Sequence, residues 1–518
     1  MPVGPEVPAH GVGVGEGPTG TGAAVTRTAL ILGDQLSREN PALQGADRVV
    51  LITSRTLLRR RGLHRRRAHL VLSGMRHLAA ELRERGDVEV EERTEDALLA
   101  GVDALQGDVV CAYPSSTTML DALQERGVEL TPAPQFLTSP EAFARWADGR
   151  RSLRMEDFYR EQRRRLEVLV DDAGEPAGGV WNLDHDNRRP PPKGGLGAPE
   201  PWAPEEDEID ERVRRDLDRS GIDFWGHDGP RAFAVTPDEA TSALRSFVQG
   251  RLRDFGPWQD AMVDGERTLF HSLLSVPINL GVLPPMRAVR AAERAYLRDD
   301  APLQSVEGFV RQIIGWREYV WGMYWLRAPQ WPRRNALRAR EPLPRAYREA
   351  DSGWRCLDET VRSVRETGYA HHIERLMVLG TIGLTSGVRP WDLVHWFARG
   401  FVDGAEWVMA PNAAGMALFA DGGEMMSKPY AAGGNYVNRM SQHCPSCRYD
   451  PKRRTGEDAC PVTALYWDFL DRHRDDLADN RRLAMPMRSL ARIDGDELDA
   501  IRARARRARR ELRGTAAT

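Results

Sequence analysis

The spacing of apolar residues changes once along this chain, and that change restricts the fold more than any other feature of the sequence. Between residues 27 and 138, short apolar runs such as TALILG and DVVCAYP alternate with helical stretches such as RAHLVLSGMRHLAAELRER. Alternation of this kind predicts a parallel sheet in an α/β domain. From residue 236 to residue 518 the spacing is helical almost throughout. The sequence therefore predicts a Rossmann-like N-terminal domain followed by an all-α domain.

Two segments fit neither pattern. Residues 139–235 combine a helical stretch at 155–170 with the proline-rich run NLDHDNRRPPPKGGLGAPEPWAPEEDE. We interpret this segment as a long connector over the surface, because loops of this length are usually functional or disordered. Residues 1–26 are rich in Gly, Pro and Ala and lack the basic start and apolar core of a signal peptide. They are predicted to form a disordered tail.

Composition limits the cellular location and the binding partners that the protein can have. No apolar run reaches the roughly 18 residues of a membrane-spanning helix, so no membrane partner is expected. Five cysteines without an export signal favour the reducing cytoplasm, where paired cysteines more often bind metal than form disulfides. The formal net charge of −3 excludes a uniformly basic surface. A nucleic-acid site would be a local patch, for which the arginine-rich run 59–67 is a candidate beside the simpler reading of a solvated face.

The cysteines carry the strongest chemical signal. Cys444-Pro-Ser-Cys447 is followed by Cys460-Pro461, and Cys356 lies far upstream. A C-x2-C pair presents two thiolates to one centre, and a proline after the last cysteine recurs in ferredoxin-type cluster loops. Zinc also accepts four thiolates, so the spacing alone leaves zinc and an iron–sulfur cluster equally open. Cys111, in a predicted strand, is interpreted as a buried small apolar residue.

A second candidate site lies in the helical half. His371 and His372 begin the motif HHIER, and adjacent helical residues point about 100° apart, so only one of them can face a given pocket squarely. A satisfied pair of core histidines is the alternative. Tryptophans and tyrosines at 316–331 are equally consistent with ordinary aromatic packing. The glycine-rich loop ADGGEMMSKPYAAGGNYVNRM allows a close backbone approach but carries no phosphate-loop or dinucleotide fingerprint.

Several longer stretches resemble one family. They are LILGDQLS (30–37), SLRMEDFYREQRR (152–164), HSLLSVPINLGVLPP (271–285), EGFVRQIIGWREYVWGMYWL (307–326), YAHHIERLMVLG (369–380), EWVMAPN (406–412), FADGG (419–423), KPYAAGGNYVNRMS (428–441) and CRYDPKRRTGEDACPVTALYWDFL (447–470). From about residue 27 to the C-terminus the chain resembles the prokaryotic iron–sulfur photolyases and cryptochromes, also called deoxyribodipyrimidine photolyase-related proteins.

The resemblance implies a fold and an activity. The fold is an α/β antenna domain at 27–138, the connector, and a helical domain at 236–518 that holds FAD and the metal site. The activity is that of a DNA photolyase, a lyase, of (6-4) type: reduced FAD, excited by light, donates an electron to a pyrimidine (6-4) pyrimidone photoproduct flipped into the pocket. The alternative is a cryptochrome-like photoreceptor or DNA-binding regulator without repair. Damaged DNA is the implied partner, and a monomer is expected.

The resemblance also assigns residues. It implies a 4Fe–4S cluster on Cys356, Cys444, Cys447 and Cys460. His372 is the implied proton donor to the lesion, supported by His371, and Tyr430 lines the lesion pocket. The implied FAD contacts are Ser272, Leu273 and Ser275 near the phosphates, Gln312, Trp316 and Arg317 beside the cofactor, a buried pair of Arg375 and Asp403 beside the isoalloxazine, and Asn412. Trp396 matches a member of the family's electron relay.

The chain departs from the family pattern at three places. Arg348 stands where the family has a tryptophan that supplies electrons to FAD, and Phe397 stands where a tyrosine follows Trp396. The acidic and aromatic residues of the family's lumazine antenna site are replaced by RTLLRRRG (55–62) and YPSSTT (113–118). These changes argue against a lumazine-type antenna and bear less on the flavin or the cluster.

Overall fold

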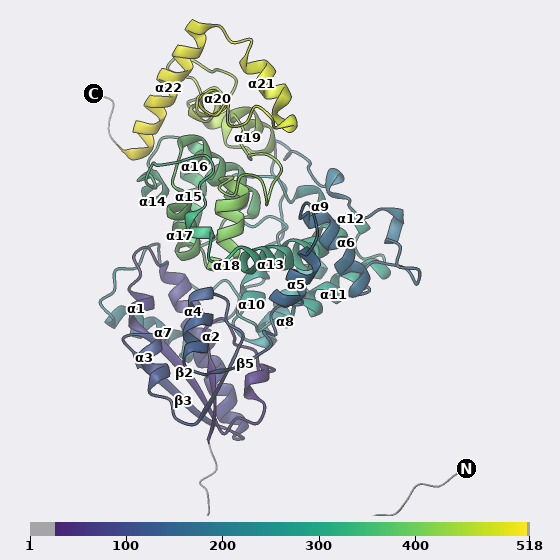
Figure 1. Ribbon diagram of the computed structural model, residues 1–518, viewed down its shortest axis with the longest axis vertical. Helices are drawn as coiled ribbons and strands as arrows, with labels where there is room; N and C mark the ends of the chain where they lie inside the picture. The colour runs from purple at the N-terminus through teal and green to yellow at the C-terminus, as the bar shows by residue number, and fades with distance from the viewer. Residues whose placement is uncertain (1–25, 515–518) are drawn as a thin grey trace, which may run out of the picture.

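The computed structural model describes residues 26–514, and it begins with a five-stranded parallel sheet (Figure 1). The strands are β1 (Arg27–Ile31), β2 (Arg48–Ser54), β3 (Glu89–Glu95), β4 (Asp108–Ala112) and β5 (Glu129–Thr131). Their order is β3-β2-β1-β4-β5, and every neighbouring pair is parallel. The parallel α/β domain predicted from the sequence is confirmed. The predicted tail lies outside the described residues apart from Thr26.

The central strands are apolar because both of their faces are covered. Four consecutive residues of β2, Val49–Ile52, are buried, whereas the edge strand β3 carries mostly charged side chains. The helical elements of this domain are η1 (Pro41–Leu43), α1 (Arg55–Leu58), α2 (Arg65–Arg85), α3 (Leu98–Asp103) and α4 (Thr117–Glu125). The long helix α2 carries a buried face of leucines and alanines that packs on the sheet.

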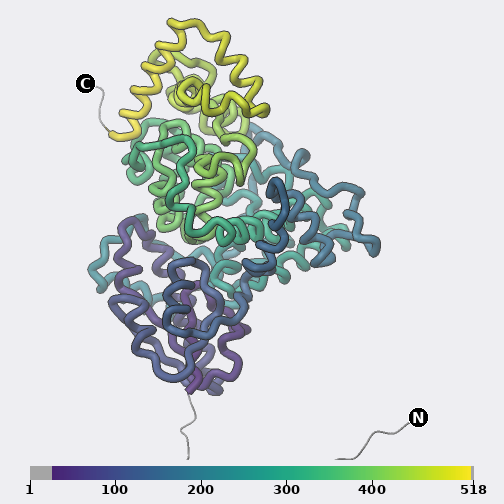
Figure 2. The backbone as a smooth tube through the Cα atoms, in the orientation of Figure 1, coloured from purple at the N-terminus to yellow at the C-terminus, as the bar shows by residue number. Residues whose placement is uncertain are grey.

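The connector is more structured than the sequence indicated. It forms α5 (Pro140–Ala147), α6 (Met155–Arg165), η2 (Ala177–Gly179), η3 (Asp184–Asp186) and α7 (Glu208–Arg219). Helix α7 packs against α2, whereas α5 and α6 pack against the helical half of the chain, as the blue part of the tube in Figure 2 shows. Phe143 and Phe158 are completely buried in the core of that half. The first part of the connector therefore contributes to the helical core and does not merely cross the surface.

The rest of the chain is helical, as predicted. Its elements are α8 (Pro237–Gly250), α9 (Leu252–Trp258), α10 (Ser275–Asn279), α11 (Pro285–Leu297), α12 (Leu303–Val310), η4 (Arg311–Arg317), α13 (Glu318–Arg327), η5 (Trp331–Arg333), α14 (Ala346–Glu349), α15 (Arg355–Thr367), η6 (Glu374–Gly380), α16 (Thr381–Ser386), α17 (Pro390–Gly400), α18 (Glu406–Met409), η7 (Ala410–Ala417), α19 (Gly434–Met440), η8 (Cys444–Ser446), α20 (Pro461–Arg472), η9 (Arg481–Leu483), α21 (Ala484–Leu490) and α22 (Gly495–Arg513). The sheet and helices α20–α22 lie at opposite ends of the molecule (Figure 1).

Three of these elements, η4, η6 and η7, are π-helices within longer helical runs. Such segments are rare and occur most often at functional sites, because the extra residue in the turn redirects side chains. Segment η6 packs against η7, and η4 continues directly into α13, which also contacts η7. The helical domain thus brings three irregular segments together.

The two domains meet at the start of α2. His64 is completely buried, and its Nε2 lies 3.0 Å from the carbonyl oxygen of Val364 and 3.2 Å from that of Arg365. Its Nδ1 accepts a hydrogen bond from the backbone of Arg66 and so caps α2. One imidazole therefore joins the α/β domain to the end of α15. Across residues 26–514, no helix combines the length and the apolar character needed to cross a membrane.

Candidate functional site

The four cysteines grouped from the sequence line one cavity. Cys356 lies in the first turn of α15, Cys444 and Cys447 flank η8, and Cys460 precedes α20. The cavity is lined by all four together with Trp354, Gly434, Val437, His443, Tyr449, Pro461 and Val462. Backbone bonds from Cys447 to Cys444 and from Cys460 to Asp450 fix the two loops. The cavity thus lies between the first turn of α15 and the C-terminal segment.

Burial disfavours the charged form of these thiols. It raises the pKa of Cys356 well above its ordinary value, and the three neighbouring cysteines raise that pKa further. The pKa of Cys444 rises to about 12, again mainly through burial and then through Cys460 and Cys447. Thiolates in this cavity therefore require a positively charged group among them.

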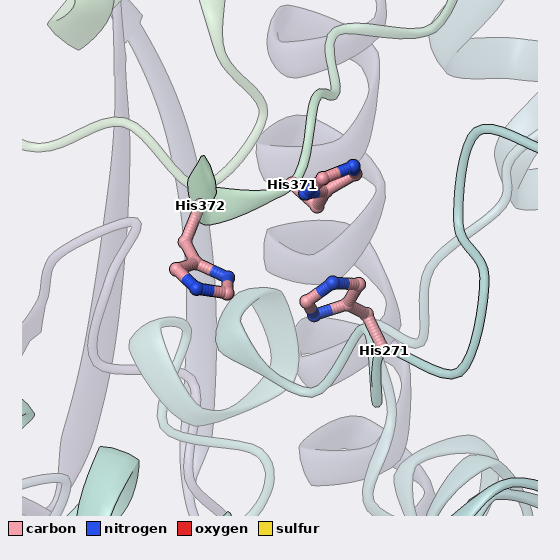
Figure 3. Close-up of side chains that lie close together, drawn as sticks. All are labelled: His271, His371 and His372. Carbon is pink, nitrogen blue, oxygen red and sulfur yellow. The ribbon is translucent and has the colours of Figure 1, made fainter. Parts of the chain in front are cut away.

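A cluster of three histidines forms a second centre (Figure 3). His371 lies just before η6 and is 2% exposed, whereas the side chain of His372 is 47% exposed, so the two neighbours face different surroundings. His271, which the sequence had not indicated, stacks on His371 with ring centroids 4.8 Å apart and planes 14° apart. It also meets the ring of His372 edge-on at 5.3 Å. His271 thus adds a third imidazole to the pair that the HHIER motif indicated.

Acidic groups hold two of these rings. His372 Nε2 lies 3.1 Å from Asp260 Oδ1, and His371 Nε2 lies 3.5 Å from Glu374 Oε2. Burial raises the pKa of Glu374 to about 7, with the charge of His443 opposing the shift. Burial also lowers the pKa of His271 and of His371 well below the ordinary value for imidazole. The two buried rings are therefore neutral, whereas His372 is the exposed ring of the three.

Tyr430 lies near the same carboxylate as His372. Burial raises the pKa of its phenol, Arg188 opposes the shift, and Asp184 and Asp260 add to it. Burial likewise raises the pKa of Tyr436, and Asp260 adds to this shift too. Asp260 therefore connects His372 electrostatically to two phenols in this polar region.

The expected ion pair of Arg375 and Asp403 is present. Arg375 donates from Nη1 to Asp403 Oδ1 at 3.0 Å and from Nη2 to Oδ2 at 3.2 Å. Ser275 Oγ donates to the same carboxylate at 2.9 Å. Ser272 and Leu273 precede α10, and Leu273 has a left-handed backbone with φ of 59°. The structure thus brings this loop next to the pair on η6 and the α17–α18 turn.

The remaining FAD candidates lie on the other two π-helices. Gln312, Trp316 and Arg317 belong to η4, and Asn412 belongs to η7. Arg317 Nη1 donates to the carbonyl of Gln135 at 2.8 Å, and its guanidinium lies 4.4 Å from the centre of the Phe136 ring. Asn412 Nδ2 donates to the carbonyl of Val408 at 2.8 Å. Arg317 and Asn412 thus already have protein partners.

Trp396 is buried within an aromatic group. Its ring lies 5.4 Å from Tyr347, 5.6 Å from Phe401 and 6.0 Å from Trp225, and its Nε1 has no hydrogen-bond partner among the described residues. Arg348 follows the buried Tyr347 on α14 and is itself exposed. The guanidinium at position 348 therefore belongs to the surface.

Sequence reasoning missed His271, Asp260 and Glu374. His271 directly precedes Ser272 and Glu374 directly precedes Arg375, so each stands beside a residue that the motifs had singled out. Asp260 lies 112 residues before His372 and belongs to no motif, so its partner is visible only in the structure.

Comparison with known proteins assigns the family. Residues 29–233 match the family described as deoxyribodipyrimidine photo-lyase-related protein. A (6-4) photolyase of Agrobacterium fabrum is 40% identical over 504 residues, which cover 93% of this chain and 98% of that protein. The chain belongs to the photolyase-related family.

Solved structures agree on the fold of this photolyase-related chain. A bacterial class III photolyase from Agrobacterium tumefaciens aligns with a TM-score of 0.52 at 15% identity, covering 96% of this chain and 100% of that one. The cryptochrome of Synechocystis sp. PCC6803 aligns with a TM-score of 0.53 at 14% identity, covering 93% and 99%. The order of a parallel sheet, a connector and a helical domain is thus the photolyase and cryptochrome fold.

Proposed function

We propose that this protein is a light-dependent DNA-repair flavoprotein, a lyase that splits pyrimidine (6-4) pyrimidone photoproducts. The observation that carries the proposal is an exposed histidine, His372, whose ring is held by Asp260 and meets the buried His271 edge-on. Tyr430 lies within electrostatic range of the same carboxylate. The (6-4) photolyase of Agrobacterium fabrum matches nearly the whole chain and supports the same reaction. Residues 27–138 would then form the antenna-type domain, and residues 236–518 the domain that holds the cofactors.

The residues around Asp403 fit FAD. The hydroxyl of Ser275 and the guanidinium of Arg375 converge on this carboxylate. Arg67 of α2 lies within electrostatic range of Asp403 and makes no hydrogen bond to residues 26–514, while burial lowers the pKa of its guanidinium to about 10. A half-buried cation without a hydrogen-bond partner suits a phosphate. Reduced FAD, when bound and excited by light, supplies the electron for repair.

The spacing of the thiols favours a 4Fe–4S cluster over zinc. Zinc bonds thiolate sulfur at about 2.3 Å, which places the four sulfurs of a tetrahedral site about 3.8 Å apart. Among the described residues, the groups of three or more candidate ligands with donor atoms within 4.8 Å of one another do not include these cysteines. No three of the four sulfurs thus lie within 4.8 Å of one another, so one zinc ion would require the thiols to move closer together. A cluster with its own inorganic sulfide fits better and would fasten α15 to the C-terminal segment.

Proton transfer to the lesion would fall to His372. Its side chain is exposed, and Asp260 Oδ1, 3.1 Å from its Nε2, orients the ring. Burial lowers the pKa of His371 and of His271, so these two neutral rings are poorer proton donors. Tyr430, which lies within electrostatic range of Asp260, is the residue we propose to contact the flipped base.

Blue-light repair of an oligonucleotide that carries one defined (6-4) photoproduct tests this proposal. We expect repair once FAD has been chemically reduced, and binding to damaged DNA that weakens as salt rises, because backbone contacts release counterions. Absence of repair with fully reduced FAD and bound damaged DNA would contradict the proposed reaction.

A photoreceptor or DNA-binding regulator without repair is the second candidate. The observation that favours it is the surface arginine at position 348, where the family has a tryptophan, because a guanidinium cannot be oxidised as an indole can. Full repair activity in the preceding experiment would dismiss this candidate. We also propose that the protein works as a cytoplasmic monomer without a lumazine antenna. None of its five cysteines forms a disulfide, and segments 55–62 and 113–118 lack the expected antenna residues.

A further inference from the structure

The side chains of His271, His371 and His372 share a pattern of polar contacts. Each ring has one nitrogen committed to an oxygen atom or to the backbone. His372 Nε2 lies 3.1 Å from Asp260, and His371 Nε2 lies 3.5 Å from Glu374. The ring of His271 is hydrogen-bonded to the backbone of Gln259, and its Nδ1 makes this bond because its Nε2 has no partner among the described residues.

The second nitrogen of each buried ring is left without a partner. Nε2 of His271 and Nδ1 of His371 are fully buried and make no hydrogen bond within residues 26–514, although these residues are only 8% and 2% exposed. A buried polar atom without a partner costs about 1 to 3 kcal/mol, so native proteins retain few of them. Two such atoms, one on each of two stacked rings, therefore point to a group that both rings bind.

The three rings bring nitrogens close to one another. One ring nitrogen from each of His271, His371 and His372 lies within 4.8 Å of the others. We propose that these three residues form a binding site for a divalent transition-metal ion, in particular zinc, with its open position on the exposed side of His372. This site is separate from the four-cysteine cavity.

The surroundings match those of known histidine–metal sites. A metal-bound histidine almost always donates its other ring N–H to a carboxylate or a backbone carbonyl, which fixes the ring and raises its basicity. Asp260, Glu374 and the backbone of Gln259 occupy these positions. Imidazole ligands select zinc, copper and nickel, whereas magnesium and calcium prefer oxygen. The chemistry therefore excludes the hard cations.

Binding requires a small local change. Nitrogens around a tetrahedral zinc ion lie about 3.3 Å apart, at bonds of about 2.0 Å. The rings must therefore move closer, and the nearly parallel planes of His271 and His371 require one ring to turn about its Cβ–Cγ bond. His372, on the exposed side, can move most easily. The site is thus suited to reversible binding of zinc more than to permanent binding of a structural zinc ion.

A second group of three candidate ligands provides a matched control. His77 lies 3.7 Å from Asp207 and 3.9 Å from Asp210. The carboxylate of Asp210 is already occupied by the guanidinium of Arg231, at 3.0 and 2.9 Å, and by the hydroxyl of Ser73. This group is an internal ion-pair network, and we expect no zinc binding there.

Calorimetric titration of the purified holoprotein with Zn²⁺, in the dark and without DNA, tests the site. We expect one zinc ion per chain, with affinity reduced about tenfold or more in His271→Gln and in His372→Gln, and unchanged in His77→Gln. The exposed His372→Gln variant keeps the test valid if His271→Gln folds poorly. Loss of binding in the His77 variant, unaltered binding in both site variants, or no binding to the wild type would overturn the proposal.

A consequence for repair rests on the proposed function. A zinc ion bound to a ring nitrogen of His372 would leave that nitrogen without a proton to donate to the lesion. Zn²⁺ should therefore inhibit repair reversibly, and Mg²⁺ at the same concentration should not. Because binding is measured separately from repair, failure of the repair reaction leaves the zinc site testable, and failure of zinc binding leaves the repair reaction untouched.

Discussion

Trp225 of the connector lies against Trp396 of α17, with ring centroids 6.0 Å apart and planes at 65°. The indole at position 396 therefore has a partly exposed aromatic neighbour, Trp225, through which electrons can reach it without a tryptophan at position 348. We expect Trp396→Phe to slow the photoreduction of bound FAD at least tenfold, and Trp225→Phe to slow it severalfold. The measurement is the bleaching of flavin absorption under blue light with an external thiol.

The variant Arg348→Trp distinguishes electron entry through position 348 from electron entry through Trp225. If electrons enter through the family's usual position, this variant should photoreduce faster than the wild type. If they enter through Trp225, it should change little, and Trp225→Phe should be the slow variant. An unaltered rate in both Trp225→Phe and Trp396→Phe would show that neither indole supplies the flavin.

Removal of a cluster ligand should cost stability as well as colour. In Cys356→Ser we expect loss of iron and sulfide and an unfolding midpoint lower by about 5 to 10 °C, because the site joins α15 to the C-terminal segment. Iron and sulfide analysis after anaerobic purification, together with thermal unfolding, measures both effects. Cys111→Ala is the control, since Cys111 lies in the sheet core. Stoichiometric zinc without sulfide in the wild type would refute the cluster.

Acid should weaken the junction between the two domains. Burial lowers the pKa of His64 to about 4 from an ordinary 6.5, so the unfolded chain takes up this proton first as the pH falls. Stability from this group is complete above pH 6.5 and is lost as the pH falls from 6.5 towards 4, by about 2 kcal/mol between pH 7 and pH 5. Protonation also removes the Nδ1 acceptor that caps α2.

Urea unfolding at pH 7 and at pH 5 measures this loss. In His64→Asn, the asparagine keeps a capping acceptor but does not titrate, so its unfolding free energy should fall less over the same range. Other histidines titrate in both proteins, and the difference between the two isolates His64. Equal losses in the variant and the wild type would contradict the assignment.

Much of the fold was predictable because it follows from local patterns. Alternation of apolar runs indicated the sheet, and the cysteine motifs indicated which segments meet at the cavity. The π-helices were not predictable, since one extra residue in a turn leaves the apolar spacing of a helix nearly unchanged. Helix α6 coincides with the predicted helical stretch at 155–170, but the burial of Phe143 and Phe158 in the helical core was missed, because periodicity does not show which core a short helix joins.

The candidate site was predictable only where its residues share a motif. His371, His372 and Arg375 stand together in HHIER, and the buried His371 precedes the helix in which the exposed His372 lies. His271 reaches them from a segment 100 residues earlier, where it stacks on His371. A contact between segments so distant leaves no trace in the periodicity of a single sequence.

The bond between Asp260 and His372 provides the last prediction. The carboxylate orients the ring that donates to the lesion, so Asp260→Asn should keep FAD, the cluster and binding to damaged DNA, yet lower the repair rate about 10²-fold. His372→Ala should lose at least as much turnover, and the double variant should lose no more than His372→Ala alone, because both changes disable one proton donor. Repair under blue light with pre-reduced FAD measures all three rates. Losses that add in the double variant would show that Asp260 does not act through His372.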